Sequence, residues 1–425
     1  MKAELKPENA DRVGLWVVSE LYYPEETSTG YYMTQIAEGL ANDFEVKVIC
    51  GQPNYSMRGT TAPSCELRRG VEIHRVSGTR LDKNIILFRL VNMLTLGASV
   101  LIKAFKSFKA GDRVLVVTTP PNMPFIVALA SLFRGASYTL LIHDNYPEIL
   151  VAVGKTRRDS IFARSVDFCN RWLFKHSARL IVVGRDMEEL LRSKSAGLEV
   201  PITTIPNWAE LETVEPRPKS DNALLGKLGL RDKFVFLYAG NMGHPNDIET
   251  IVEAAEILRD REEIHFIFLG SGIKRKWLVD RVAERRMTAI TVLEPRPRSE
   301  QLDFLNACDI ALVSLVGKMW GVSMPSRTYN ALAAGKPILA LTEPDSEVDR
   351  VIKEDSIGWS LPPGDPAKLA AMIIEILDCR GDLAAMAKRA REAATVKYSL
   401  DLALKKYRVV MESPSNQAFI QSVNA

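Results

Sequence analysis

The stretch MPSRTYNALAAGKPILAL, residues 324–341, carries a helix and a strand of one α/β unit and decides how the second half of the chain folds. Pro325 suits the first turn of a helix, because the N–H group that proline lacks would have no partner within the helix there. Gly335 followed by Pro337 predicts that this helix ends and that an apolar strand begins. A helix that leads into a short, continuously apolar strand is typical of a parallel sheet with helices on both faces.

The same alternation of short apolar runs and longer amphipathic runs extends over most of the chain. Weak alternation within the apolar runs indicates strands that are buried on both faces. The predicted strands are 13–19, 44–49, 113–118, 138–143, 179–183 and 203–205 in the first half, and 234–238, 264–269, 289–293, 309–314 and 337–341 in the second. Helical patterns lie between most of them, for example at 30–42, 124–133 and 159–174. The chain is therefore predicted to be an α/β protein with two doubly wound parallel sheets.

The two series of strands are separated by residues 209–232, which are polar, contain two prolines and lack a long apolar run. Such a composition is typical of a domain boundary. We therefore expect a first domain over residues 1–210 and a second over residues 211–398. A last predicted helix, at about 400–412, and a tail that is expected to fray make up residues 399–425.

Composition narrows the class of protein. A length of 425 residues suggests two or three domains, and a net charge of only +3 argues against a general nucleic-acid-binding protein. The five cysteines are scattered and lack C-x-x-C spacing, which favours reduced thiols in a cytosolic protein over a disulfide or zinc framework. The first residues contain no apolar segment typical of a signal peptide, so we expect a cytoplasmic protein rather than a periplasmic binding protein.

Common nucleotide-binding fingerprints are absent from the sequence. The first predicted strand runs into SELYYPEETSTG, residues 19–30, with Gly30 as its single glycine, so it is not the G-x-G-x-x-G turn of a dehydrogenase. There is also no G-x-x-x-x-G-K-[ST] phosphate loop and no H-E-x-x-H metal motif.

The start of the helix within 324–341 is the strongest candidate for an anion site. Ser326 and Arg327 are predicted to lie in its first turn, where free backbone N–H groups and the positive end of the helix dipole attract phosphate. The guanidinium of Arg327 is a fork-shaped, charged donor that suits a phosphate group. We interpret this segment as a diphosphate cradle. The alternative is an ordinary capped helix with a surface arginine.

Two glycine-containing loops follow predicted strands of the same domain. They are YAGNMG, residues 238–243, and FLGSGIKRKW, residues 268–277, in which Lys274 and Arg275 are candidates for phosphate contacts. Glycine turns join strands to helices in many proteins, so neither loop is specific alone. Their shared position at the carboxyl ends of strands, where open α/β sheets bind ligands, favours one common site.

A histidine and two carboxylates are the candidate reactive groups of the first domain. In TLLIHDNYPE, residues 139–148, His143 and Asp144 end an apolar strand and are expected to project into a cleft. Such a pair can hydrogen-bond a sugar hydroxyl or transfer protons. Glu148 is a weaker candidate for an acid/base or acceptor contact. The alternative is that Asp144 or Asn145 caps the next helix.

One segment is unusually apolar: IILFRLVNMLTLGASVLIKAF, residues 85–105. Arg89 and Asn92 interrupt it, and it never reaches the run of about 18 apolar residues typical of a spanning helix. Two interpretations remain. The segment is either a buried helix of the first domain or an amphipathic helix that brings nearby lysines close to anionic lipid, namely Lys103, Lys106 and Lys109.

Taken together, these motifs resemble those of family 4 glycosyltransferases with the GT-B fold, especially enzymes that assemble bacterial O-antigen, capsule and colanic-acid-type polysaccharides. The segments that carry the resemblance are YYPEETSTG (22–30), IHDNYPE (142–148), IPNW (205–208), YAGNMG (238–243), FLGSGIK (268–274) and MPSRTYNALAAGKPILA (324–340). The resemblance implies two Rossmann-like domains that face each other across a cleft. The first domain would bind an acceptor and the second a nucleoside-diphosphate sugar, commonly a UDP-sugar. The final helix would cross back onto the first domain.

The resemblance also assigns roles to individual residues. It places His143 against the donor sugar and Arg296 near the base, and it implies that no metal is required, in keeping with the absence of a D-x-D triplet. The catalytic candidates are His143, Asp144 and Glu148. The donor-site candidates are Gly30, Gly240, Asn241, Gly243, Gly270, Gly272, Lys274, Arg275, Arg296, Ser326, Arg327 and Asn330.

The chain departs from the family pattern at four positions. Two glutamates spaced by eight residues in many relatives correspond to Val322 and Asn330 here, and an arginine and a lysine correspond to Asn241 and Asn246. We expect Arg327, with Lys274 and Arg275, to supply the missing positive charge. Membership of the family implies that the anomeric configuration is retained.

The sequence thus predicts a metal-independent hexosyl- or N-acetylhexosaminyltransferase that moves a sugar from a nucleoside diphosphate to a lipid-linked saccharide. It is expected in the cytoplasm, at the cytoplasmic face of the inner membrane, with no cofactor besides its donor substrate and no nucleic-acid partner. Two alternatives are a nucleotide-sugar epimerase, whose G-T-R-P-E-type opening is missing, and a non-catalytic nucleotide-sugar-binding protein of the same fold.

Overall fold

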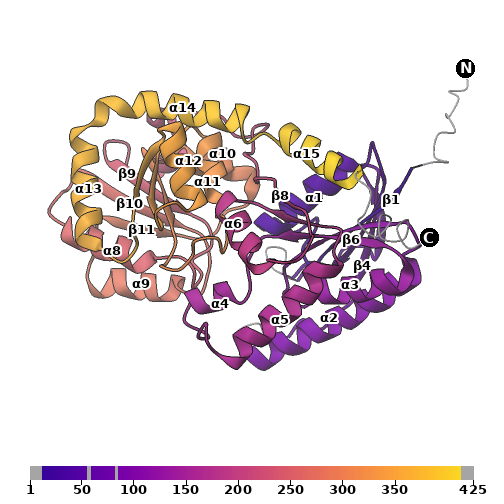
Figure 1. Ribbon diagram of the computed structural model, residues 1–425. Coiled ribbons are helices and arrows are strands. Elements are labelled where there is room, and N and C mark those ends of the chain that lie inside the picture. The colour runs from indigo at the N-terminus through magenta and orange to yellow at the C-terminus, as the bar shows by residue number, and fades with distance from the viewer. Residues whose placement is uncertain (1–11, 55–58, 82–84, 413–425) are drawn as a thin grey trace, which may run out of the picture.

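The computed structural model describes residues 12–54, 59–81 and 85–412, which form two α/β domains side by side (Figure 1). The expected tail beyond residue 412 lies outside the described residues. Each domain is a mainly parallel sheet between layers of helices, so the predicted α/β class with two doubly wound sheets is confirmed.

The first sheet has eight strands in the order β3-β4-β2-β1-β5-β6-β7-β8, and all neighbours are parallel except β3 and β4. Its central strand, β1, is apolar and buried from Leu15 to Val18, which explains why weak alternation predicted it. The strands are β1 (Gly14–Ser19), β2 (Glu45–Gly51), β3 (Cys65–Arg68), β4 (Val71–Val76), β5 (Arg113–Val117), β6 (Ser137–Ile142), β7 (Arg179–Val182) and β8 (Ile202–Thr204).

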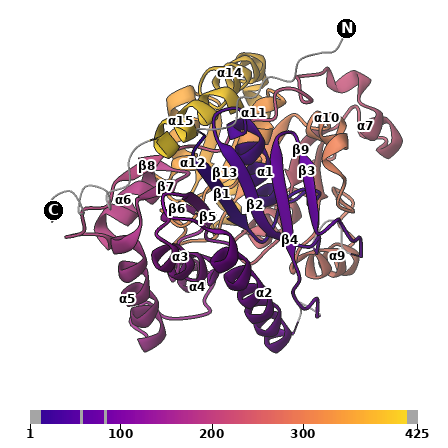
Figure 2. The ribbon, with the colours of Figure 1, turned by 90° about the vertical axis from the view of Figure 1, so that its right-hand side faces the viewer.

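Helices cover both faces of this sheet. The helices α2, α3 and α5 lie side by side on one face, and α1 lies on the other (Figures 1 and 2). The helices of this half are α1 (Ser28–Leu40), α2 (Ile86–Ser107), α3 (Met123–Arg134), α4 (Glu148–Ala152), α5 (Ile161–His176) and α6 (Arg185–Lys194).

The second sheet has six parallel strands in the order β11-β10-β9-β12-β13-β14. They are β9 (Phe234–Ala239), β10 (Ile264–Leu269), β11 (Ile290–Leu293), β12 (Ile310–Ser314), β13 (Ile338–Leu341) and β14 (Gly358–Leu361). The helices are α7 (Ala223–Leu228), α8 (Ile248–Ile257), α9 (Arg275–Glu284), α10 (Gln301–Leu305), α11 (Arg327–Ala333), α12 (Glu347–Asp355), α13 (Pro366–Asp378), α14 (Leu383–Val396) and α15 (Leu400–Glu412). Three short 3₁₀ turns lie at 219–221, 298–300 and 380–382.

The connection between the sheets runs from residue 205 to residue 233 and contains α7, so part of the predicted linker is folded. The chain returns to the first domain at its end, because α15 packs against α1. Arg408 of α15 pairs with Asp43 at 2.7 Å, and Leu404 lies where a Cβ at Gly39 would be. Tyr407, on the same helix, is buried.

The apolar segment at 85–105 forms α2, and the interpretation of it as a buried helix is wrong for its outer side. Leu96, Val100 and Ala104 are buried, whereas Leu87 is 65% exposed and Leu94 64%. By length and composition alone, Leu87–Ser107 is the one helix in the described part of the chain that could cross a membrane, with a mean hydropathy of 1.5.

Candidate functional site

The predicted binding loops gather where the strand order of the second sheet reverses. Chain order runs outward from β9 through β10 to β11, and the next strand, β12, lies on the other side of β9. Loops that diverge at such a point leave a crevice at the carboxyl ends of the strands, where α/β proteins bind ligands. The YAGNMG loop follows β9, and the segment that ends in Ser326 and Arg327 follows β12.

The glycines of the two loops allow those loops to pack against each other. Gly270 has φ +144°, and a Cβ placed on it would lie 2.1 Å from the carbonyl oxygen of Gly240. A Cβ on Gly272 would likewise meet the backbone of Met242, whose N–H donates to the Ser271 carbonyl at 2.7 Å. Gly270 and Gly272 therefore have a structural reason to be glycine, independent of any ligand.

Arg327 lies at the start of α11, with its guanidinium against the loop that follows β9. Its guanidinium stacks on the ring of Tyr238 at 4.1 Å, and its Nη2 donates to the Asn241 carbonyl and to Asn246 Oδ1 at 3.1 and 3.2 Å. Its Nη1 is buried and has no hydrogen-bond partner among the described residues. A buried charged donor without an acceptor is costly, so this atom indicates a place for an anionic ligand.

The helix that carries Arg327 begins later than predicted. Ser326 is the residue before the first turn and Arg327 is the first helical residue, so Pro325 lies outside α11. The N–H groups of Thr328 and Tyr329 bond to the carbonyls of Pro325 and Ser326. Some of the N–H groups expected to be free for phosphate are therefore already used.

Lys274 and Arg275 are engaged with carboxylates. Lys274 Nζ donates to the Asn246 carbonyl at 2.7 Å and to Glu249 at 2.8 Å, while Arg275 pairs with Glu294 at 2.5 Å. Both lie beside the glycine loops. Each nevertheless keeps a donor for a ligand, because the ammonium of Lys274 has a third N–H group and the buried Nε of Arg275 has no hydrogen-bond partner among the described residues.

The first domain reaches the same crevice through the start of α1. Ser28 Oγ and Ser326 Oγ are 2.9 Å apart, and Gly30 lies in the first turn of α1, where its N–H donates to Thr27 Oγ1 at 3.2 Å. A Cβ on Gly30 would lie 2.6 Å from the Glu25 carbonyl oxygen, so a tight turn requires this glycine.

Arg296 was expected near the base of the donor, but the arginine of this segment that reaches the first domain is Arg298, which the sequence did not single out. Its guanidinium stacks on Tyr31 of the first domain at 3.7 Å, and its backbone N–H donates to Glu26 at 3.2 Å. Arg296 instead forms a salt bridge with Glu300 at 2.8 Å. The tandem P-R-P-R sequence offers no signal that separates the two arginines.

His143 and Asp144 follow β6, at the edge of the first sheet that faces the second domain. Asp144 forms an isolated β-bridge with Ser323, and the Asn145 side chain donates to the Gly321 carbonyl at 2.7 Å. Burial lowers the pKa of His143 to about 4 and raises the pKa of Asp144 to about 6. His143 Nε2 is buried and finds no partner within the described structure, so it is available to a ligand.

Glu148 has partners of its own on the first domain. Its Oε1 accepts from Arg158 at 2.9 Å and its Oε2 from Lys194 at 2.6 Å. Both carboxylate oxygens are therefore occupied by cations, and a structural ion pair accounts for this residue without a role in proton transfer.

The two positions that the family resemblance matches to glutamates, Val322 and Asn330, differ in character. Val322 is 1% exposed and packs with Leu315 and Met319 in a small apolar cluster, so no charged group could replace it without loss of packing. Asn330 is partly buried on α11, one turn beyond Ser326. Its amide can offer hydrogen bonds to a ribose but cannot act as a carboxylate.

A pair of exchanged helix caps joins the two domains next to the crevice. Asp186 of α6 accepts hydrogen bonds from the N–H groups of Gly321 and Glu347, each at 3.1 Å. In return, Glu347 of α12 accepts from the N–H of Arg185 at 2.8 Å and from its guanidinium. Each helix thus supplies the acidic group that the start of the other helix favours.

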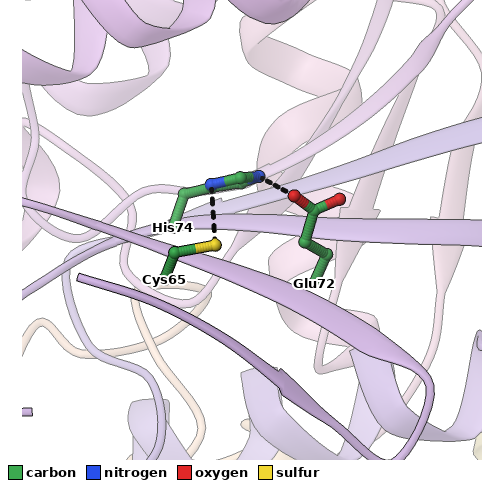
Figure 3. Close-up of side chains that lie close together, drawn as sticks. All are labelled: Cys65, Glu72 and His74. Atoms are coloured by element: carbon green, nitrogen blue, oxygen red, sulfur yellow. Dashed lines mark hydrogen bonds and ion pairs between the residues drawn. The ribbon is translucent and has the colours of Figure 1, made fainter. Parts of the chain in front are cut away.

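Away from the crevice, one group of side chains among the described residues has the composition of a metal site: Cys65, Glu72 and His74 on the edge strand β3 and its neighbour β4 (Figure 3). The imidazole lies between the other two groups, with Nδ1 3.7 Å from the Cys65 sulfur and Nε2 3.0 Å from Glu72. Because the thiol and the carboxylate approach opposite ring nitrogens, the geometry is that of a surface hydrogen-bonded chain.

Both halves of the chain match known family models. Residues 28–208 match the model described as "Glycosyl transferase 4-like domain", and residues 222–393 match "Glycosyl transferases group 1". The chain is 32% identical to the probable glycosyltransferase WbjE of Pseudomonas aeruginosa over 394 residues, which covers 92% of this chain and 96% of that protein. It is 26% identical to the putative colanic acid biosynthesis glycosyl transferase WcaI of Escherichia coli K12, over 78% of this chain and 83% of that one.

Solved structures of the same fold cover nearly the whole chain. Sucrose-phosphate synthase from Thermosynechococcus elongatus has a TM-score of 0.76 at 16% identity, over 96% of this chain and all of the other. Anabaena Alr3699/HepE, in complex with UDP-glucose, has a TM-score of 0.72 at 14% identity, over 95% of this chain and all of the other. At such identities the likeness establishes the fold alone.

Proposed function

Since the chain belongs to glycosyltransferase family 4 and has the GT-B fold, we propose that it transfers a sugar from a nucleoside-diphosphate sugar, of the UDP class, to a lipid-linked saccharide. The lipid-linked acceptor would belong to bacterial surface polysaccharide biosynthesis, the setting named for the WcaI relative. The HepE neighbour, whose title names a complex with UDP-glucose, supports the choice of donor class.

The observation that carries the proposal is the buried, unpartnered Nη1 of Arg327 at the switch point of the second sheet. A diphosphate there would satisfy this donor. The charge that develops on the leaving diphosphate would be stabilised by the same guanidinium, in place of the basic residues that this chain lacks in the 240–247 loop. The proposal therefore requires no metal ion, and the reaction should retain activity in the presence of a chelator.

On the opposite side of the crevice, His143 would bind the transferred sugar as a neutral imidazole. Its pKa of about 4 leaves it uncharged near neutral pH, so it can orient a hydroxyl but cannot supply a proton from an imidazolium. Asp144 would accept a second sugar hydroxyl. Because Val322 stands where the family resemblance expects a glutamate, these first-domain groups would have to stabilise the sugar. We also propose that the anomeric configuration is retained, as membership of the family implies.

Replacement of Arg327 tests this assignment. Arg327→Ala should reduce donor turnover by about 100-fold or more, because a preorganised charged donor is lost at the leaving group. Arg327→Lys, which keeps the charge but not the fork, should recover part of that loss. The measurement is nucleotide release from the donor, together with a thermal melt of each variant.

The matched control is Arg259→Ala, since Arg259 lies on the surface of the same domain with a side chain that is 77% exposed. This control should behave as the wild type does. Near-normal turnover by a folded Arg327→Ala protein would overturn the assignment of the diphosphate site.

A lipid-linked acceptor implies that the enzyme works at the cytoplasmic face of the inner membrane. A saccharide linked to a lipid stays at the bilayer surface, so an enzyme that uses it benefits from residing there. The partly exposed α2, with Lys103 and Lys106 in its last turns and Lys109 just beyond it, would provide the membrane contact that the sequence suggested.

A further inference from the structure

The sequence suggested a lipid-facing helix only at α2, but the apolar surface of the first domain extends over three helices, α2, α3 and α5. We call it the three-helix face. It is defined by six side chains that are each more than half exposed: Leu87, Leu94, Ile102, Phe133, Ile161 and Phe168. Large apolar side chains gathered on one surface of a soluble domain mark a site of interaction with another molecule or a membrane.

The three helices form one continuous surface. They lie side by side on the same face of the first sheet (Figure 2), and α3 contacts both α2 and α5. Phe105 of α2 and Phe133 of α3 pack together with ring centroids 5.7 Å apart. On α5, Ile161, Phe168 and Trp172 follow helical spacing and therefore point to one side.

The opposite sides of the same helices are fixed to the domain. Leu96, Val100 and Ala104 of α2 are buried, as are Leu173 and Phe174 of α5. Since α2 is held along this inner stripe, it cannot leave the domain to cross a bilayer without loss of the core. Its exposed stripe can nevertheless lie in the plane of a membrane surface.

The charges on the three helices have almost a single sign. Their described residues include one acidic residue, Asp167, which pairs with Arg158, against seven basic ones. The whole chain has a net charge of only +3, so positive charge is concentrated on these three helices and the remainder of the chain is net negative. The seven basic residues are Arg89, Lys103, Lys106, Arg134, Arg164, Arg171 and Lys175.

We propose that the three-helix face docks onto an anionic lipid bilayer, with α2, α3 and α5 lying along the surface. Apolar side chains would enter the headgroup region while the surrounding lysines and arginines contact lipid phosphates. The two contributions together bind a membrane more strongly than either does alone. A second copy of the chain fits this face poorly, because a symmetric contact would bring two positively charged surfaces together.

The proposed function explains why docking would be useful, because a docked enzyme has access to a lipid-linked acceptor. Only this explanation rests on the proposed function. The segment that carries His143 continues through α4 directly into α5, so docking on α5 also fixes the first-domain side of the crevice relative to the membrane. Docking itself can be measured without donor or acceptor, so its failure and the failure of the proposed function are distinguishable.

The test is co-sedimentation of the full-length protein with vesicles of phosphatidylcholine, with and without phosphatidylglycerol, at low and high salt. We expect binding that requires phosphatidylglycerol and weakens with salt. Phe168→Ser and Phe133→Ser should each weaken binding about tenfold, because each removes a large apolar side chain from the membrane. Arg164→Ala should weaken it about fivefold.

Val396→Ser on α14 is the matched control, since Val396 is 67% exposed on the second domain. It should bind vesicles as the wild type does. Equal binding by Phe168→Ser and the wild type would overturn the role of α5 and leave α2 as the sole contact. Absence of binding to any vesicle, or a dimer in solution that Phe168→Ser dissociates, would overturn docking to lipid altogether.

Tryptophan fluorescence supplies a second readout that a folding defect would not imitate. Brominated lipids quench a tryptophan that enters the bilayer, and Trp172, 36% exposed on α5, is positioned to do so. Quenching should be largely lost in Trp172→Phe and should persist in Trp277→Phe, whose tryptophan is equally exposed on α9 of the second domain. The reverse pattern would contradict the proposal.

Discussion

Two neighbouring residues at the end of β6 have pKa values shifted in opposite directions by the same cause. Burial disfavours the charged form of each, which lowers the pKa of His143 and raises that of Asp144. Between about pH 4 and 6 both side chains are therefore mainly neutral in the folded protein. Above pH 6 Asp144 carries its charge inside the crevice, where it can accept a hydrogen bond from a sugar hydroxyl.

Asp144→Asn should make the protein more stable but less active. The raised pKa means that the ionised carboxylate destabilises the folded state at pH above 6, and that this cost disappears as pH falls through 6 towards the unfolded value of 3.8. Near pH 8 the variant should gain up to about 3 kcal/mol in free energy of unfolding, and near pH 4 it should gain nothing. Denaturant titrations at the two pH values measure the difference.

The same variant should lose transfer activity at pH 8, where its stability gain is largest, since sites tuned for function are commonly paid for in stability. An unchanged stability across the pH range would show that Asp144 is not a buried charge. Full activity would show that the carboxylate does not orient the sugar.

At the scale of elements, the glycine loops after β9 and β10 act as one unit. Gly270→Ala would place a Cβ 2.1 Å from the Gly240 carbonyl and demand an unfavourable φ of +144°, so the β9 loop would have to move away from Tyr238 and Arg327. Donor binding should fall at least about tenfold, because a displaced backbone loses its contacts with the ligand. Calorimetric titration with the donor measures this change.

Gly317→Ala is the matched control for that prediction, since nothing lies within 4 Å of a Cβ at Gly317 and its φ is not positive. It should bind donor normally. If donor affinity were unaffected in both variants, the two loops would not contribute to the donor-binding site.

Most elements could be predicted from sequence because the central strands are buried on both faces and therefore read as continuous apolar runs. The strands that escaped prediction, β3, β4 and β14, lie at a sheet edge or next to one. In β4, Val71, Ile73 and Arg75 are buried while the intervening residues are not, and β14 is only partly buried along its length. Such short, mixed segments resemble loops when only composition is considered.

The candidate site was less predictable than the fold. Residues with the same local sequence context can differ in role, because tertiary contacts determine which of them reaches the site. Arg298 rather than Arg296 reaches the first domain, although the two have the same local sequence context. The apolar helix α2 shows the same limit. Both of its stripes are apolar, so only the packing of Leu96 and Val100 against the domain reveals which side remains exposed.

For the molecule as a whole, the exchanged caps of α6 and α12 determine how the domains are held beside the crevice. Asp186→Ala would leave the N–H groups of Gly321 and Glu347 without their acceptor in a buried interface. We expect the free energy of unfolding to fall by about 2–4 kcal/mol. Donor affinity should also fall, since the crevice depends on both domains. Urea unfolding and donor titration measure the two effects.

Glu189→Ala is the control on the same helix, because Glu189 is 49% exposed and makes a salt bridge across the same interface with Arg350. Loss of an exposed pair should cost at most about 1 kcal/mol. If the two variants proved equally stable, the exchanged caps would not be what holds the domains together.

The most direct test of the central claim is acceptor-dependent release of nucleotide. The purified protein is incubated with UDP-, GDP- and dTDP-sugars, with and without a lipid-linked saccharide acceptor, and both free nucleotide and glycosylated acceptor are measured. A glycosyltransferase of the proposed kind should release nucleotide from a UDP-sugar only when acceptor is present, in amounts equal to the sugar transferred. An isomerised donor without acceptor, or tight donor binding with no release under any condition, would contradict the account.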